Sequence, residues 1–416
     1  MANQEPHKNR SIKSVLTFVS SACDTDLNKL ITDNSLRVFM VHIRLGVIGL
    51  SAKGGWASTD LIPPIFDPLL ADKYTLTALC TSSAQSAKDA SEKYSKLAGC
   101  TVKAYHGKQG QVDIANDPEV DMVVVSVKIP EHYEAVLPAI EAGKMIFVEW
   151  SPGKNLDETV RIARAVKEKG LRSMVGAQGI NAAYVKKVKE IIDSGKIGKV
   201  LSTSLLGSGP YFGKITMPPY NYIYNIQNGL TLLTVPISHF LVVLKHTLGT
   251  FVEVNATGAI RIPTAQIIDP ANGKPLADSL TNKTTHDQVI LSGLLKGRTP
   301  NHDGIVANIH YQGGVTVEEP FRWVIYGEEG TVEVKATKDM PGANIATHEK
   351  DVYLNDQKID LGETEADKRL GPTGRAWLEF ARGEDGVYES PESSLNIYRV
   401  VDAALTSIRE GKKVVL

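Results

Sequence analysis

Cysteine, aromatic residues and net charge are all scarce in this chain of 416 residues. Its three cysteines, Cys23, Cys80 and Cys100, have neither C-x-x-C nor metal-ligand spacing, which argues against a disulfide framework and against a metal site. This usage fits a reducing compartment, so we expect a cytoplasmic protein. No apolar run approaches the length of a membrane span, and we expect no contact with a membrane.

Charge excludes another class of partner. The formal net charge is -1, so the chain has no electrostatic reason to bind nucleic acid directly. Hydrophobic residues make up 42% of the chain, which is ordinary for a globular protein, and 416 residues exceed what one core usually holds. Two domains are therefore predicted.

The first forty or so residues carry no helix or strand periodicity. Lys8, Arg10 and Lys13 precede the apolar residues 15–19, but that run is too short and too polar for a signal peptide. We expect residues 1–42 to form a disordered or loosely attached extension.

A glycine-rich turn dominates the next segment. An apolar run ends at Gly49, and the spacing Gly49-x-Ser51-x-x-Gly54 follows, with a predicted helix up to Leu70. Glycine permits a tight turn at the strand end, and free amides at a helix start can bind a diphosphate. Serine replaces the middle glycine of the usual G-x-G-x-x-G pattern. The segment predicts a dinucleotide-binding strand, turn and helix.

Strand and helix patterns alternate from Ile43 onward, which predicts a parallel doubly wound Rossmann domain over residues 43–178. The second strand, 74–80, is followed by Thr81 and Ser82 and by no acidic residue that could hold the adenosine ribose. NAD and NADP both remain possible, with NADP favoured. Later predicted elements are a strand at 121–127, a helix at 131–142, a strand at 145–150, a helix from Asn155 to Gly170 and a strand at 171–177.

The pattern changes beyond Lys199. A helix at 184–193 leads into a second α/β domain, residues 179–416, whose C-terminal helices can pack back on the first domain. Strand candidates follow one another without regular helices between them, which predicts a largely antiparallel open sheet, with one face packed on helices and one free to meet another subunit. These candidates are residues 200–206, 251–260, 288–295, 305–311, 322–326 and 331–335.

Several short motifs together resemble one family. In order along the chain they are residues 45–50, 132–134 with 142–144, 147–149, 191–199 and 326–334. Their joint order resembles the Gfo/Idh/MocA oxidoreductases from about Ile43 to the end. The resemblance implies an N-terminal Rossmann domain and a C-terminal α/β domain on an open antiparallel sheet that is often the oligomer interface. Residues 49–52, 55–57, 147–150 and 222–225 with Asn228 and Gly229 are also similar to the galactose-regulon repressor branch, whose members are non-enzymatic and bind a dinucleotide and a transcriptional activator.

The resemblance also implies a cofactor, NAD or NADP. The residues expected to bind it are Gly49, Leu50, Ser51, Gly54, Gly55, Trp56, Thr81, Ser82, Pro130, His132, Glu149, Trp150 and Gln178.

Two family positions depart from the dehydrogenase pattern. Family enzymes usually carry Glu-Lys-Pro where this chain has Glu149-Trp150-Ser151, and an indole offers one N–H and no charge in place of the lysine. We interpret Trp150 as a wall of the nicotinamide pocket. The family aspartate four residues before the histidine is Val235 here, so His239 acts either as a general acid/base or as a buried histidine satisfied by a backbone carbonyl.

Two tyrosines offer a second source of protons. Tyr222 and Tyr224 could donate one if a cation or the cofactor ribose lowered their pKa values, although tyrosines in loops more often serve packing.

Two hypotheses follow. The preferred one is an NAD(P)-dependent oxidoreductase acting on a small hydroxy or carbonyl substrate, such as a sugar, with His239 and a tyrosine as proton relay. The alternative is a non-enzymatic dinucleotide-binding transcriptional regulator that acts through contact with a protein partner. Both predict a homo-oligomer formed through the C-terminal sheet.

Overall fold

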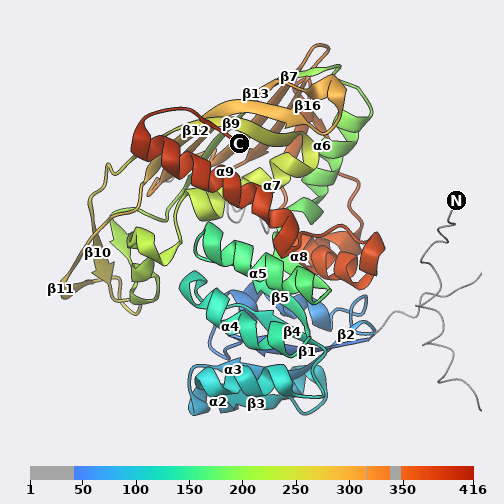
Figure 1. The fold of residues 1–416 in the computed structure, drawn as a ribbon, viewed down its shortest axis with the longest axis vertical. Helices are drawn as coiled ribbons and strands as arrows, with labels where there is room; N and C mark the ends of the chain where they lie inside the picture. Colours follow the sequence, from blue (N-terminus) through green and yellow to red (C-terminus); the bar gives the residue numbers. More distant parts are fainter. Residues whose placement is uncertain (1–41, 316, 338–347) are drawn as a thin grey trace, which may run out of the picture. The chain divides into compact units, whose positions relative to one another are not determined.

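The computed structural model describes residues 42–315, 317–337 and 348–416. The expected N-terminal extension lies outside these residues, apart from His42. The described chain has the predicted α/β architecture, with a parallel sheet in its N-terminal part and a larger mixed sheet in its C-terminal part (Figure 1).

The N-terminal sheet is parallel throughout and has the strand order β3-β2-β1-β4-β5-β6 in the described chain. This is the predicted doubly wound arrangement, with the glycine-rich turn at the carboxyl end of the central strand β1. The strands are β1 (Ile43–Ile48), β2 (Tyr74–Thr81), β3 (Lys103–His106), β4 (Met122–Val125), β5 (Met145–Glu149) and β6 (Ser173–Gly176).

In the part of the chain that the structure describes, the helices that accompany this sheet are α2 (Ala84–Ala98), α3 (Gly107–Asn116), α4 (Ile129–Glu141) and α5 (Leu156–Glu168). The predicted start of α5 is confirmed, because the Asn155 side chain accepts the Glu158 backbone N–H at 2.9 Å. Helix α4 begins two residues earlier than predicted. Pro130 lies inside its first turn, where a missing N–H costs nothing.

The long helix predicted after the glycine-rich turn is wrong. A five-residue π-helical turn, η2 (Ala57–Leu61), and a 3-10 turn, η3 (Pro63–Phe66), stand in its place. Pro63 and Pro64 have no N–H to donate, so an α-helix that continued through them would lack two backbone hydrogen bonds. A turn this short has little macrodipole, so a diphosphate here would depend on backbone amides rather than on a helix dipole.

The C-terminal sheet has the order β17-β16-β15-β14-β7-β13-β12-β9-β18 in the described chain. All neighbouring strands are antiparallel except β7 and β13, so the predicted largely antiparallel sheet is confirmed. The strands are β7 (Val200–Gly209), β9 (Gly249–Ala259), β12 (Gln288–Gly297), β13 (Ile305–Gly313), β14 (Phe321–Gly327), β15 (Thr331–Ala336), β16 (Asp351–Leu354), β17 (Gln357–Ile359) and β18 (Val414–Val415).

Helices pack beside this sheet. α6 (Ala183–Asp193), α7 (Ser238–Thr247) and α9 (Pro391–Glu410) lie along it, with α7 and α9 both contacting β9 (Figure 1). The expectation of no regular helix between the strands is wrong at α7, which precedes β9. Alternate residues of the strands are exposed, among them Leu206, Ile290, Val306 and Tyr326. His310 on β13 lies opposite both Leu206 on β7 and Ile290 on β12, so these two side chains share one face of the sheet. Val306 is four residues before His310 on β13 and therefore lies on the same face.

A small sheet and a kinked helix complete the fold. The small sheet has the order β11-β10-β8, from β8 (Ile215–Thr216), β10 (Thr264–Ile268) and β11 (Pro275–Asn282). Helix α8 (Glu365–Ala381) is kinked at Gly371 and contacts η2 and η3. Its Trp377 donates to the Leu61 carbonyl at 2.9 Å and stacks on Phe147, so α8 is anchored to the N-terminal sheet.

One stretch, Ile226–Thr247, is long and apolar enough to span a membrane by length and composition, which the sequence reading did not anticipate. Most of its most apolar window is buried inside the protein. The stretch also joins the short turns η6 (Ile226–Asn228) and η7 (Leu233–Ile237) to α7, and Pro236 lies within η7. We interpret it as a core element.

Candidate functional site

The glycine-rich turn begins where β1 ends. Gly49 has φ +100°, and a Cβ there would lie 2.0 Å from the Ser126 carbonyl oxygen at the end of β4. Gly54 and Gly55 also have positive φ, but a Cβ at either would meet no heavy atom within 4 Å. Gly49 is therefore required by packing, whereas Gly54 and Gly55 are required by backbone conformation alone.

Ser51 occupies the position of the missing middle glycine. Its hydroxyl accepts the Lys53 N–H at 3.2 Å, and its carbonyl accepts the Ser58 hydroxyl at 2.5 Å. The side chain thus folds back on the turn. Leu50 is fully buried in the core, so its expected role in binding a cofactor can come only from its backbone.

Of the two hydroxyl residues at the end of β2, only Ser82 is free to bind a ligand through its side chain. Thr81 donates to the Ser83 carbonyl at 3.1 Å, and Ser83 caps α2 by accepting the Ser86 N–H. Ser82 is exposed and makes no hydrogen bond with any described residue. On α2, Lys93 reaches back to donate to the Ala52 carbonyl at 3.1 Å, which brings a positive charge to the glycine-rich turn.

Glu149, at the end of β5, forms a buried hydrogen-bonded cluster. Its Oε1 accepts Nε1 of Trp56 at 2.7 Å and Nε2 of Gln178 at 3.0 Å, and its Oε2 accepts the Trp150 backbone N–H at 3.2 Å. Burial raises the pKa of Glu149 to about 7, against the opposing effect of these donors. The structure therefore brings together three predicted cofactor residues around a carboxylate poised near neutral pH.

Trp150 is packed in the interior, and its expected role as a wall of the nicotinamide pocket stays a prediction. The residue is only 5% exposed, and its indole N–H is donated to the Thr234 carbonyl at 2.9 Å and to Oγ of Ser238 at 2.6 Å. The ring lies 5.6 Å from that of His239 and 6.1 Å from that of Tyr398. Trp150 thus fastens the end of β5 to η7 and α7, and its single donor is already used.

His132 ties two loops together. It is buried, with Nδ1 2.7 Å from the Ser151 carbonyl and Nε2 3.0 Å from the Val127 carbonyl. Burial lowers its pKa, and a neutral imidazole can donate to only one of these carbonyls. Both nitrogens face backbone carbonyls, so His132 holds the loops after β4 and β5 together, and its expected role in binding the cofactor stays a prediction.

His239 lies beside Trp150 and lacks the backbone partner that one of its two expected roles requires. The imidazole is half-buried and forms no hydrogen bond with any described residue, so the alternative of a carbonyl-bonded histidine is wrong. Burial lowers its pKa to about 4, so the ring is neutral at physiological pH and a weak base. Val235, four residues before it, supplies no partner that would fix its tautomer.

The two tyrosines lack the environment that proton donation would need. Lys128 lies with its ammonium 5.1 Å from the Tyr222 ring, yet burial raises the pKa of Tyr222 to about 12. Tyr224 is buried and donates to the Gly213 and Ile215 carbonyls at 3.4 and 3.3 Å, and burial raises its pKa too. The neighbouring protein groups therefore do not lower either pKa, and a role for these tyrosines as proton donors stays a prediction.

Some contacts of the site could not be read from the sequence. Thr234 and Ser238 accept the Trp150 N–H, and Lys128 approaches the Tyr222 ring. Thr234, Ser238 and Lys128 belong to no recognisable motif in the sequence. A helical period places Thr234 and Ser238 one turn apart, which is the only local signal for the pair. The partner of that pair, however, lies over 80 residues away.

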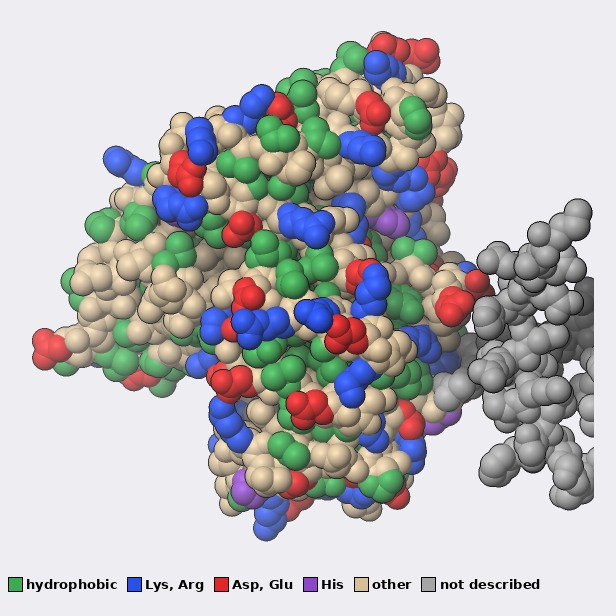
Figure 2. Space-filling model, viewed as in Figure 1, with side chains coloured by type: hydrophobic (Ala, Val, Ile, Leu, Met, Phe, Trp, Pro, Cys, Tyr) green, Lys and Arg blue, Asp and Glu red, His purple; other side chains and the backbone are tan. Residues whose placement is uncertain are grey.

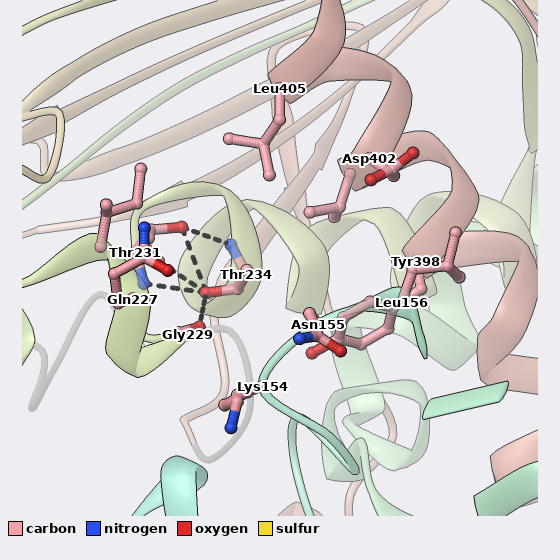
Figure 3. A pocket seen from close by; sticks show the side chains of 12 residues that line it. Lys154, Asn155, Leu156, Gln227, Gly229, Thr231, Thr234, Tyr398, Asp402 and Leu405 are labelled. Carbon is pink, nitrogen blue, oxygen red and sulfur yellow. Dashed lines mark hydrogen bonds between the residues drawn. The ribbon is translucent and has the colours of Figure 1, made fainter. Parts of the chain in front are cut away.

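A separate cavity of about 170 Å³ lies between the start of α5, the segment before α7, and α9 (Figure 3). Its lining includes Asn155, Gln227, Thr231, Thr234, Tyr398 and Asp402, and none of the expected cofactor residues. Thr234 and Tyr398 also contact Trp150. Within the described residues, no group of three or more His, Cys, Asp or Glu side chains could hold a metal ion.

Comparisons with known proteins place these features in a family. The model of the Gfo/Idh/MocA oxidoreductase family, described as an NAD-binding Rossmann fold, matches residues 43–177, and the model of the Gal80p C-terminal domain matches residues 183–336. Dehydrogenase aclE of Aspergillus oryzae is 30% identical over 380 residues, which cover 89% of this chain and 97% of that protein.

Regulators are similar as well. The galactose/lactose metabolism regulatory protein GAL80 of Saccharomyces cerevisiae is 30% identical over 267 residues, which cover 62% of this chain and 59% of that protein. The crystal structure of a super-repressor mutant of Gal80p from the same yeast has a TM-score of 0.77 at 23% identity, covering 90% of this chain and 98% of that chain. An aldose-aldose oxidoreductase from Caulobacter crescentus has a TM-score of 0.67 at 17% identity, covering 90% of this chain and 100% of that chain.

The two structural likenesses establish the fold alone, whereas the family models and the full-length likeness to a dehydrogenase establish descent. The chain belongs to the Gfo/Idh/MocA oxidoreductase family, with an NAD-binding Rossmann domain followed by a Gal80-like C-terminal domain.

Proposed function

We propose that this protein is a regulator that binds a nicotinamide dinucleotide and does not turn it over. The observation that carries the proposal is the state of Trp150, whose only donor is used inside the protein. Hydride transfer to or from a hydroxy or carbonyl substrate needs a group that exchanges a proton with the substrate oxygen. In family enzymes, a lysine at this position serves that purpose.

The remaining candidates are poorly tuned for that exchange. A general acid/base works best with a pKa near the operating pH, whereas burial lowers the pKa of His239 to about 4 and raises that of Tyr222 to about 12. Tyr224 donates to backbone carbonyls in the interior. No residue at the expected catalytic positions therefore combines a free donor with a suitable pKa.

The cofactor is NADP in preference to NAD under this proposal. Thr81 and Ser82 place no carboxylate at the end of β2, and Lys93 brings a positive charge to the neighbouring turn. A 2'-phosphate is tolerated in such surroundings better than beside an acidic residue.

The output of the regulator is contact with protein. Gal80 proteins, which are named as regulators of galactose and lactose metabolism, are similar to this chain in both sequence and fold. Exposed apolar side chains on the C-terminal sheet, such as Leu206, Ile290 and Val306, provide a surface for a second copy of the chain. On the face shown in Figure 2, basic and acidic side chains are interspersed, with no broad field of one sign that would favour nucleic acid.

Binding and turnover must be measured on the same preparation. Calorimetry with NAD, NADH, NADP and NADPH should reveal binding, while nicotinamide absorbance should stay constant with a panel of polyols, aldoses and ketones. Sustained turnover of any of these substrates would overturn the proposal.

A pair of glycine variants tests the binding site. Gly49→Val should abolish binding, because its Cβ would lie 2.0 Å from the Ser126 carbonyl oxygen. Gly99→Val is the matched control, since Gly99 also has positive φ but a Cβ there would meet no heavy atom within 4 Å, and it lies at the far end of α2. A folded Gly49→Val protein that binds as wild type would place the cofactor elsewhere.

The oxidoreductase remains a second candidate because of one observation. The His239 imidazole is neutral, half-buried and free of hydrogen bonds with the described residues, so it can still accept a proton. The likeness to dehydrogenase aclE over nearly the whole chain also supports this candidate.

A further inference from the structure

We infer that Glu149 is a positioning residue, whose ionised carboxylate holds the glycine-rich turn in its dinucleotide-binding conformation by way of the Trp56 indole. The inference rests on the proposed binding of a dinucleotide. It assigns to Glu149 and Trp56 the task of holding the conformation of the turn, which is separate from any direct contact with the cofactor. Glu149 ends β5, whereas Trp56 directly follows Gly54 and Gly55 on the turn.

The contact between the two side chains is short and well placed. Nε1 of Trp56 lies 2.7 Å from Oε1 of Glu149, and Glu149 as a residue is 8% exposed. The backbone N–H groups of Ser58 and Thr59 both donate to the Gly55 carbonyl. Trp56 therefore lies inside a hydrogen-bonded turn, and a movement of its backbone would also move Gly55. A charge-assisted bond to Trp56 therefore fixes the end of the turn that follows its two positive-φ glycines.

The neighbouring strand makes room for this carboxylate. Gly176 pairs with Glu149 across β5 and β6, and a Cβ at Gly176 would lie 2.0 Å from Oε2 of Glu149. Any side chain at Gly176 would push the carboxylate away from Trp56. The site of the carboxylate is therefore built by two strands as well as by its donors.

Gln178 supplies the means to release the turn. Its amide N–H is donated to Glu149, while its own Oε1 is buried and has no partner among the described residues. If Glu149 takes up a proton on Oε1, a flipped Gln178 amide can accept a hydrogen bond from that O–H through its own Oε1, and the unpartnered oxygen gains a partner. Trp56 then loses its charged acceptor, and the turn is held less firmly.

Both states are reachable near neutral pH, since burial raises the pKa of Glu149 to about 7. Asp60 on η2 adds a negative charge that favours the protonated state. Two histidines contact the residues that directly follow Glu149: His132 on α4 lies 2.7 Å from the Ser151 carbonyl, and the ring of His239 on α7 lies 5.6 Å from that of Trp150. Burial lowers the pKa of each. Neither of them forms a hydrogen bond with Glu149, so ionisation of Glu149 is the titration that reaches the turn.

The test measures NADP affinity of the full chain by calorimetry at about pH 6 and about pH 8. Wild type should bind more weakly at the lower pH. Trp56→Phe keeps an aromatic ring but removes the donor, and Glu149→Gln keeps the shape but removes the charge. Each should weaken binding about tenfold at the higher pH, where the tether is charged, and each should flatten the dependence on pH. The double variant should bind as weakly as either single variant.

A control and a second route keep the test decisive. Trp323→Phe removes an indole bond of 2.8 Å to Thr203 in the distant C-terminal sheet and should leave affinity unchanged. If Glu149→Gln fails to fold, Trp56→Phe still tests the tether, because Trp56 is only half-buried. Wild-type affinity in a folded Trp56→Phe protein, or wild-type binding that does not vary with pH, overturns the inference and leaves the proposed function standing. Absence of dinucleotide binding by wild type overturns both.

Discussion

Replacing Trp150 by lysine restores the residue that family dehydrogenases carry, yet we expect it to destabilise the protein rather than create an enzyme. Trp150 is 5% exposed, and its ring packs between elements that are distant in sequence, near His239 and Tyr398. A lysine that fills this space buries an ammonium, and a lysine that turns outward leaves a cavity. Both outcomes cost free energy of folding.

The size of the loss follows from what the indole does. Removing a buried aromatic side chain costs about 3–5 kcal/mol, and we expect Trp150→Lys to fall in that range. Trp150→Phe is the matched variant that keeps most of the ring and removes the N–H. Thr234 and Ser238 remain bonded to each other at 2.6 Å in its absence, so this variant should cost only about 1–2 kcal/mol.

Urea unfolding followed by circular dichroism ranks the three proteins without relying on tryptophan fluorescence. Because a chain of this length need not unfold in one step, the order of the midpoints is the quantity to compare. Wild type should be the most stable, then the phenylalanine variant, then the lysine variant. A lysine variant as stable as wild type would refute the packing argument. Loss of equal size in both variants would show that the indole N–H, rather than the volume, stabilises this contact.

Four further expectations concern other parts of the molecule. His239→Asn should leave NADP affinity and melting temperature nearly unchanged, because the pKa of about 4 puts the imidazole outside its titration range at neutral pH; if the protein is an enzyme, the same variant should lower turnover by about 10²- to 10⁴-fold. Ser82→Asp should shift preference from NADP to NAD in competition binding, since a carboxylate there repels the 2'-phosphate and can hold the ribose. Burial raises the pKa of Glu149 from 4.5 to about 7, so between those values only the unfolded state loses the proton and stability falls as pH rises. The free energy of unfolding should fall by about 3 kcal/mol across this pH range in wild type, and Glu149→Gln should remove that fall when urea unfolding is compared at several pH values. Leu206→Arg with Ile290→Arg should reduce the mass measured by light scattering if the C-terminal sheet joins two copies, and an unchanged oligomer would exclude this face.

The Rossmann sheet could be predicted because its signals are local. Residues 122–125 are four consecutive apolar residues of a strand buried on both faces, and Gly143 and Gly170 follow their helices with positive φ. The start of α5 at Asn155 was equally readable, since the capping side chain and the backbone it caps are three residues apart. Each of these features is specified within one turn of the chain.

Features that depend on distant partners could not be read in the same way. The Trp56 and Glu149 side chains are 93 residues apart, and Trp150 and Ser238 are 88 apart, so no local pattern joins either pair. The wrong helix after the glycine-rich turn has a different cause, because the two prolines that end it are present in the sequence and their effect outweighs the apolar spacing.

The departures at positions 150 and 235 belong together physically. Val235 follows Thr234, whose carbonyl accepts the Trp150 N–H, and both lie in the short turn η7. With an indole in place of the ammonium, a carboxylate at position 235 would have no cation among these contacts, and it would be half-buried beside a neutral His239. Valine keeps the site uncharged and adds apolar contact. Trp150→Lys or Val235→Asp alone therefore introduces one uncompensated charge and tests the packing of this region. A capacity for proton transfer can be tested only in the double variant, where the lysine and the aspartate return together.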